Sequence, residues 1–165
     1  MELRFKITAR EIFVFSVNNY YRSVSGIVSV LCTIAALIFI VFNRERIGIK
    51  VADLLFMVIL LVAVGQVFIM RQRAARQAAN PVSSQEMFFK ISSDGIRVRQ
   101  GKETGNVTWD QVLRVKKISG IFMLYLSRNQ AYLIPERAFR GAGKQRFLQL
   151  IEKNVPANKR KGIKI

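Results

Sequence analysis

The chain has 165 residues, of which 51% are hydrophobic, and its formal net charge at pH 7 is +17. It contains one cysteine and no histidine, which excludes an intrachain disulfide, a zinc site of the Cys/His type and histidine-based catalysis. A sequence that is both apolar and strongly basic is typical of a membrane protein whose charged parts lie near anionic lipid.

Residues 1–22 form a polar and aromatic lead before the first long apolar run. Leu3 to Thr8 alternates like a short strand, which could add to a sheet formed by the C-terminal part of the chain. Thr8 and Glu11 have the spacing of a capping box and predict the start of a helix. Aromatic residues follow, of the kind that lies at the headgroup level in front of a span: Phe13, Phe15, Tyr20 and Tyr21. We therefore expect an interfacial helix here.

Two apolar runs within residues 23–80 predict a hairpin of two transmembrane helices. The first run, residues 24–42, has no charge and as a helix measures about 28 Å, close to the ~30 Å hydrocarbon core. The second run, residues 51–70, carries only Asp53, in its first turn, where the carboxylate can reach the headgroups. A buried functional Asp53 is the alternative. The link between the runs is too short for a domain, so the two spans are antiparallel.

Small side chains recur along one face of the first span: Ser25, Ser29, Cys32 and Ala36. Such a face allows another helix to approach closely, so we expect it to be a helix-packing face. In the second span, Gln66 is expected to make one interhelical hydrogen bond. A transport function for Gln66 has little support.

Basic residues flank the hairpin unequally. Those outside it are Arg4, Lys6, Arg10, Arg22, Arg71, Arg73, Arg76 and Lys90, whereas the link holds Arg44, Arg46 and Lys50. The excess predicts that both termini lie in the cytoplasm, although the charged link is a counter-signal. Arg71, Arg73 and Arg76 continue the second helix, either as an orientation signal or as a binding site for anionic lipid.

Residues 81–157 predict a small antiparallel domain closed by a helix, which makes the whole chain an α+β membrane protein. Five or six short strands are expected, with Val112, Val115 and Leu113 facing inward along one of them and Trp109 in the core. A turn is expected around residues 101–105. Helical spacing of apolar residues predicts a helix over roughly 143–154. The basic tail, residues 158–165, is expected to be mobile.

Strands followed by one closing helix are the plan of a pleckstrin-homology-like barrel. Trp109 with Val112, the apolar run 122–126 and the segment Leu133-Ile134-Pro135-Glu136-Arg137-Ala138-Phe139 resemble the YcxB-like family. The resemblance covers nearly the whole chain and implies two spans near the N-terminus and a C-terminal domain of this type. It implies architecture rather than activity. The helix start at Gly141-Ala142-Gly143-Lys144 departs from the expected polar or acidic start.

That glycine-rich helix start is also a candidate for an anion site. It lies beside Arg140, Lys144 and Arg146, and flexible chain with solvated charges is the alternative. Ala138 and Gln145 stand where a Walker motif needs glycine and Ser or Thr, so the segment is not a phosphate loop of that kind. Glu136 and Arg137 are expected to pair on the surface. No metal site, cofactor or acid–base pair is predicted, and we expect no enzyme activity.

The expected function is that of a binding module in the cell membrane. From residue 81 onward, 17 lysines and arginines stand against 6 acidic residues, so anionic lipid headgroups or a membrane protein partner are the expected ligands. Surface aromatics interleaved with the cations are lacking, which makes nucleic acid the weaker partner. The alternative is an accessory or regulatory subunit of a transporter or envelope complex, or a homo-oligomer, assembled through the hairpin.

Overall fold

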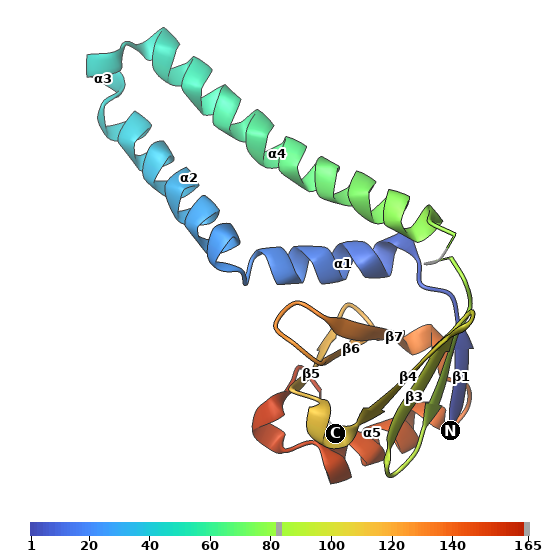
Figure 1. Cartoon of the computed structure of the whole chain (residues 1–165). Helices are drawn as coiled ribbons and strands as arrows, with labels where there is room; N and C mark the ends of the chain where they lie inside the picture. Colours follow the sequence, from blue (N-terminus) through green and yellow to red (C-terminus); the bar gives the residue numbers. More distant parts are fainter. Residues whose placement is uncertain (82–83, 164–165) are drawn as a thin grey trace. The chain divides into compact units, whose positions relative to one another are not determined.

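The computed structural model describes residues 1–81 and 84–163, and the chain divides into two compact units. One unit comprises Met1–Phe15 together with Ala75–Ile165, and the other is Ser16–Ala74. Figure 1 shows the order of the elements along the chain. The first residues of the chain therefore fold with the C-terminal domain, although the hairpin separates the two in sequence.

The hairpin consists of α2 (Val24–Phe42), the short α3 (Arg44–Ile47) and α4 (Ile49–Ala79). Ser23 caps α2, because its hydroxyl accepts a hydrogen bond from the Gly26 amide at 3.0 Å. Both long helices are apolar and long enough to cross a membrane, and little of either is buried. The two apolar helices thus suggest a membrane protein. α2 has the bounds of the first predicted span, whereas α4 begins before the second predicted span and continues to Ala79.

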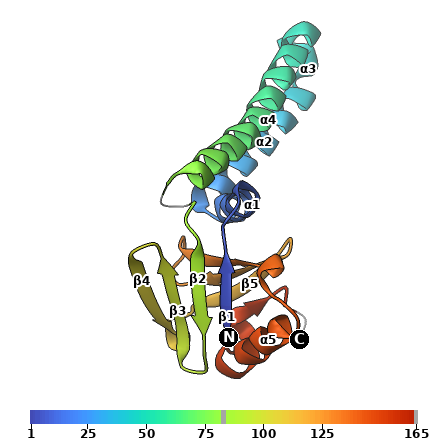
Figure 2. The ribbon, with the colours of Figure 1, turned by 90° about the vertical axis from the view of Figure 1, so that its right-hand side faces the viewer.

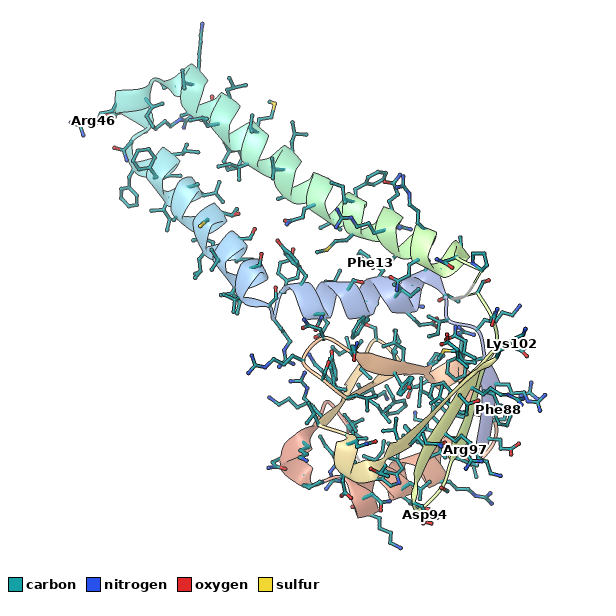
Figure 3. All side chains as sticks on the ribbon, viewed as in Figure 1. Phe13, Arg46, Phe88, Asp94, Arg97 and Lys102 are labelled. Carbon is teal, nitrogen blue, oxygen red and sulfur yellow. The ribbon has the colours of Figure 1, made fainter. Side chains whose placement is uncertain are left out.

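The turn of the hairpin is held by a polar contact at its tip. Gly48 adopts a φ of 88°, in the left-handed region that favours glycine, and α4 starts directly after it. The Arg44 guanidinium donates to the Asp53 carboxylate at 2.8 Å, and both side chains are more than half exposed. Arg46 lies at the same end of the hairpin (Figure 3). Asp53 is therefore an exposed partner of the link in this structure rather than a buried group.

The first sheet of the domain has the order β1-β2-β3-β4 and is antiparallel throughout. Its strands are β1 (Glu2–Phe5), β2 (Met87–Ile91), β3 (Gly95–Gln100) and β4 (Glu103–Thr108). Figure 2 shows β1 beside β2 at one edge of this sheet. The expected addition of the N-terminal strand is confirmed. The expected turn at 101–105 is wrong in extent, because β4 already begins at Glu103 and pairs with Gln100.

The second sheet has the order β7-β6-β5-β8. Its strands are β5 (Arg114–Ile118), β6 (Ile121–Tyr125), β7 (Ala131–Pro135) and the two-residue β8 (Arg160–Lys161), which runs parallel to β5. The tail was expected to be mobile, but its described part forms a turn and a strand. Six strands, β2 to β7, lie within residues 81–157, as expected, and β1 and β8 add to their sheets from outside that range. The strand order of the described residues closes no barrel.

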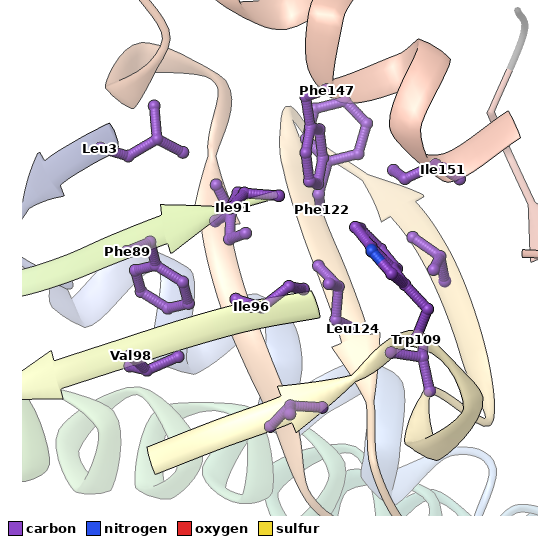
Figure 4. Packing of buried hydrophobic residues seen from close by; sticks show 14 of the residues in the cluster. Leu3, Phe89, Ile91, Ile96, Val98, Trp109, Phe122, Leu124, Phe147 and Ile151 are labelled. Atoms are coloured by element: carbon purple, nitrogen blue, oxygen red, sulfur yellow. The ribbon is translucent and has the colours of Figure 1, made fainter. Parts of the chain in front are cut away.

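The main core is filled by apolar side chains from both sheets and from α5 (Gly143–Asn154) (Figure 4). Phe147 and Ile151 of α5 are fully buried, as the helical spacing predicts. Trp109 is a core residue, and its indole N–H donates to the Ser92 carbonyl at 3.0 Å. Val112 and Val115 face inward as expected. Leu113 does not, because it is 52% exposed.

Strand β6 is buried on both of its faces. Phe122 and Leu124 belong to the main core, whereas Ile121, Met123 and Tyr125 form a second cluster with residues of α1 (Ala9–Tyr20). A strand covered on both sides needs no polar alternation, which explains the uninterrupted run in the sequence. The ring of Phe15 lies 6.1 Å from that of Tyr125. Phe15 therefore packs on the domain, and a position of the other aromatic residues at the headgroup level stays a prediction.

Candidate anion-binding surfaces

Cationic side chains gather on the outer face of the first sheet. Successive residues of a strand point to opposite faces, and Leu3, Phe89 and Val98 point into the core. Their neighbours therefore point outward, and the register aligns them in two rows across the strands. We call this surface the basic face; it comprises Arg4, Phe88, Lys90, Arg97 and Arg99, of which Figure 3 labels Phe88 and Arg97.

The centre of the basic face is an aromatic ring between two guanidinium groups. Arg4 and Arg99 lie directly opposite Phe88 on its two neighbouring strands. Their guanidinium carbons are 5.1 and 5.3 Å from the centre of the Phe88 ring, within the range of cation–π attraction. The ring thus holds both arginines over the sheet while leaving their charges exposed. This half-buried Phe88 is an aromatic among surface cations that the sequence analysis did not identify.

Little negative charge offsets these cations. Among the outward-pointing residues of β1, β2 and β3, Glu2 is the only acid, and its carboxylate is 4.0 Å from the Lys90 ammonium. Arg97 donates to the Asn106 side chain at 3.0 Å, which orients the guanidinium without neutralising it. The basic face therefore presents a positive potential to any anion that approaches the sheet.

A cleft of about 500 Å³ lies between β1 and the segment that leads into α5. One wall is formed by residues 1–4 and the opposite wall by the segment that leads into α5, and three arginines line it: Arg4, Arg140 and Arg146. We call it the β1 cleft. In Figure 2, β1 lies between β2 and α5, which is the arrangement that gives the cleft its two walls.

The predicted anion site at the start of α5 is divided by the structure. Arg140 and Arg146 line the β1 cleft, but Lys144 does not. The Lys144 ammonium instead lies 2.7 Å from the Glu136 carboxylate, which receives the Lys117 ammonium at the same distance. Two of the three predicted residues thus share one cleft, together with Arg4, which the sequence analysis did not include.

The other predicted residues lie on the long helices. Arg71, Arg73 and Arg76 are exposed along α4. On α2, Ser25 and Cys32 are exposed and Ser29 and Ala36 are half-buried. The expected interhelical hydrogen bond of Gln66 is present, because its amide donates to the Tyr20 hydroxyl of α1 at 2.5 Å.

Glu136 and Arg137 do not pair with each other, contrary to expectation. Arg137 reaches the N-terminal segment, where its guanidinium donates to the Glu11 carboxylate at 3.0 and 3.2 Å and to the Lys6 carbonyl at 2.7 Å. Glu11 also accepts from the backbone N–H and the hydroxyl of Thr8, at 2.5 and 2.6 Å. The predicted link between Thr8 and Glu11 is therefore confirmed, and Arg137 extends it into a contact between distant parts of the chain.

The hydrogen bonds from Lys117 and then Lys144 hold the pKa of Glu136 below the ordinary glutamate value of 4.5. Because the pKa of Glu136 is lower in the folded protein than in the unfolded chain, the ionised carboxylate stabilises the fold at pH values above 4.5. This contribution to the free energy of unfolding is lost as the pH falls through the pKa of the folded protein. We expect the stability difference between the wild type and Glu136→Gln to be constant from neutral pH down to about 5 and to shrink at lower pH. Chemical denaturation at several pH values would test this, and an unchanged difference at pH 3 would contradict it.

The basic face was missed although its signal is present in the sequence. Alternation in IRVRQ already places Arg97 and Arg99 on one face, and the same holds for Arg4 in LRFKIT. What the sequence does not give is the strand order, so nothing indicated that Arg4 and Arg99 flank the same ring.

Within the described residues, no group of three or more histidines, cysteines or acids could hold a metal ion.

The model of one protein family, described as YcxB-like protein, matches residues 91–151. This stretch runs from the end of β2 into α5 and contains most of the strands of the domain. The match confirms the family resemblance over these residues. No curated protein and no solved structure matches the chain.

Proposed function

We propose that this chain, which matches the YcxB-like family over residues 91–151, is a non-enzymatic, membrane-anchored binding module whose basic domain engages anionic lipid headgroups. The observation that carries the proposal is the basic face, where Arg4 and Arg99 flank Phe88, two further cations lie in the next row, and Glu2 is the only acid on the three strands. Each basic group near an anionic surface contributes on the order of 1 kcal/mol, so four together suffice to orient a domain that is already tethered.

In this proposal the chain has a defined orientation in the membrane. Helices α2 and α4 cross the cell membrane as a two-span hairpin, both termini lie in the cytoplasm, and the domain resembles a pleckstrin-homology-like fold in its strands and closing helix. The excess of arginine and lysine outside the link supports this orientation. Arg71, Arg73 and Arg76 supply further positive charge at the end of α4 and attract the same lipids.

A fluorescent probe on the basic face tests the proposal directly. Thr104 is exposed and lies opposite Arg99 in the register, so a dye on Thr104→Cys in a Cys32→Ser background reports on this surface alone. The full chain is placed in nanodiscs whose headgroups carry a quencher. We expect quenching with anionic lipid, little with zwitterionic lipid, and loss of the effect near 1 M salt, where the Debye length is about 3 Å.

Charge reversal supplies the control. Arg97→Glu with Arg99→Glu should abolish the lipid-dependent quenching, whereas Lys153→Glu, an exposed lysine in the last turn of α5, should leave it unchanged. Equal quenching in both kinds of nanodisc, or quenching that survives the double reversal, would show that the basic face does not engage anionic lipid.

An accessory or regulatory subunit of a transporter or envelope complex is the second candidate. It is favoured by the apolar surfaces of α2 and α4, which are largely exposed, and by the small-residue face at Ser25, Ser29 and Ala36. Extraction in mild detergent distinguishes the two candidates. A reproducible larger complex that dissociates when these three residues are replaced by leucine supports assembly through the hairpin, and a lone species supports the lipid-binding module.

A further inference from the structure

We propose that the free edge of β1 is a docking site for an extended acidic segment of a partner protein, which adds to the first sheet as a further strand within the β1 cleft. Three observations carry this inference: the direction of the β1 backbone groups, the position of the cleft and the charge of its walls. Strand addition at an exposed sheet edge is a general mode of peptide recognition, in which main-chain hydrogen bonds supply affinity and flanking side chains supply specificity.

The hydrogen bonds of Met1, which precedes β1, determine which residues of β1 direct their backbone groups toward β2. The Met1 amino group donates to the Ile91 carbonyl at 2.6 Å, and the Ile91 amide donates back to the Met1 carbonyl at 2.8 Å. In an antiparallel pair, hydrogen-bonded and non-hydrogen-bonded residues alternate, so Leu3 and Phe5 also direct their backbone groups toward β2. The N–H and C=O groups of Glu2 and Arg4 therefore point away from β2.

One contact just after β1 agrees with these backbone directions. Lys6 is next in the series after Glu2 and Arg4, and its carbonyl accepts a hydrogen bond from Arg137 at 2.7 Å on the side away from β2. Arg137 thus closes the edge beyond the end of β1. The backbone groups of Glu2 and Arg4 border the β1 cleft instead, because residues 1–4 form one of its walls. A strand that enters the cleft meets two donors and two acceptors in the spacing of a sheet.

The side chains of the cleft select for negative charge. Arg4 lies on the wall formed by β1, and Arg140 and Arg146 lie on the opposite wall, against the single carboxylate of Glu2. Glutamate or aspartate side chains on an added strand would lie against the guanidinium groups of Arg140 and Arg146 and form charge-assisted hydrogen bonds with them. The cleft volume of about 500 Å³ leaves room for a short extended segment.

The same charge argues against a second copy of this chain as the occupant. With a net charge of +17, two chains repel each other, and β1 paired with another β1 would bring both copies of Arg4 together. An acidic polypeptide is the complementary ligand. The cleft and the basic face share Arg4, but Arg140 and Arg146 lie off the basic face, and Arg97 and Arg99 lie outside the cleft, so variants at these residues test the two sites separately.

The test uses the full chain in nanodiscs of zwitterionic lipid and a labelled, end-blocked hexapeptide of alternating glutamate and valine. Fluorescence anisotropy measures its binding, with a lysine–valine hexapeptide as the control for charge. We expect the acidic peptide alone to bind, and Arg140→Gln with Arg146→Gln to weaken binding by about tenfold or more. Arg97→Gln with Arg99→Gln should leave its affinity unchanged, whatever these changes do to lipid binding.

A matched pair of variants separates strand addition from simple attraction of charges. Arg4→Ala and Arg4→Pro both remove the guanidinium, but only proline removes the edge N–H, which β2 does not use. Arg4→Pro should bind the acidic peptide about 3- to 10-fold more weakly than Arg4→Ala, the value of one backbone hydrogen bond. Trp109 fluorescence, which reports the fold of the domain, should be the same in both variants.

Amide exchange of Arg4 gives a second, independent reading. In the free protein the Leu3 amide should be protected and the Arg4 amide should exchange rapidly, and the acidic peptide should slow Arg4 selectively. Equal affinities of the proline and alanine variants, or no change at the Arg4 amide, would overturn the proposal in favour of attraction without pairing. A peptide-independent dimer that Arg4→Pro abolishes would also overturn it, because the edge would then serve a second copy.

Discussion

Replacing Phe122 with alanine should lower the free energy of unfolding of the domain by about 3–5 kcal/mol, the usual cost of removing a buried phenylalanine ring. The Phe122 side chain is fully buried at the centre of β6. Its ring meets those of Phe147 and Phe139 edge-on, with centroids 5.2 and 5.7 Å apart. Alanine would leave a cavity between the second sheet and α5 that neither element can close by a small shift.

The single tryptophan makes this effect measurable in the full chain. Trp109 lies in the main core of the domain, so its fluorescence during denaturant titration in detergent follows the domain and not the apolar helices. Leu113→Ala is the matched control, because Leu113 is exposed and its removal should change stability by no more than about 0.5 kcal/mol. A loss below about 1 kcal/mol for Phe122→Ala would show that the core is packed differently.

Arg137→Ala should destabilise the domain by about 2–3 kcal/mol, less than the 3–5 kcal/mol typical of a fully buried ion pair. The Glu11 side chain is only 6% exposed, and without Arg137 its charge would keep only the hydrogen bonds from Thr8. Arg137 itself is half exposed, so water already weakens the pair, which is why the expected loss is smaller.

A double-mutant cycle isolates the pair from the other contact of Arg137. Glu11→Ala, Arg137→Ala and the double variant are compared by the same Trp109 titration. If the ion pair dominates, the double variant should be no less stable than Arg137→Ala alone, because no unpaired carboxylate remains. Arg137→Lys should recover only part of the loss, since a lysine cannot make the two parallel hydrogen bonds to Glu11. Additive losses would show that Arg137 acts mainly through the Lys6 carbonyl.

Elements with a strong local signal could be predicted from the sequence. The bounds of α2 follow from a charge-free apolar run between Ser23 and Asn43, and those of α5 follow from the spacing of Phe147 and Ile151. In these segments the residues that decide the structure lie within one or two turns of each other.

Features that depend on distant partners could not be predicted. Nothing near β8 marks it as a strand; it forms because β5 offers an edge, with Val115 opposite Arg160. Leu113 is apolar yet exposed, although its neighbours Val112 and Val115 are buried. Likewise, Arg137 lies beside Glu136 in sequence but binds Glu11, so the local pairing rule named the wrong partner.

The candidate binding surfaces likewise combine residues that a local pattern identifies with residues that only long-range pairing brings together. Arg140 and Arg146 were identified because they stand beside a glycine-rich helix start, which is a local pattern. Arg4 was considered only as an orientation signal for the hairpin. Its position in both the basic face and the β1 cleft arises from the pairing of β1 with β2, which alternation alone cannot reveal.

The pairing of Phe5 with Met87 also determines the order in which this protein can be made. Antiparallel neighbouring strands such as β1 and β2 are commonly joined by a short turn. Here the whole helical hairpin lies between them in the sequence. A ribosome therefore releases β1 long before its partner, and both apolar helices leave the exit tunnel while the first sheet is still incomplete. The first sheet can therefore be completed only after both apolar helices have left the ribosome, and a nascent chain that stalls before residue 87 would display β1 with both of its edges open.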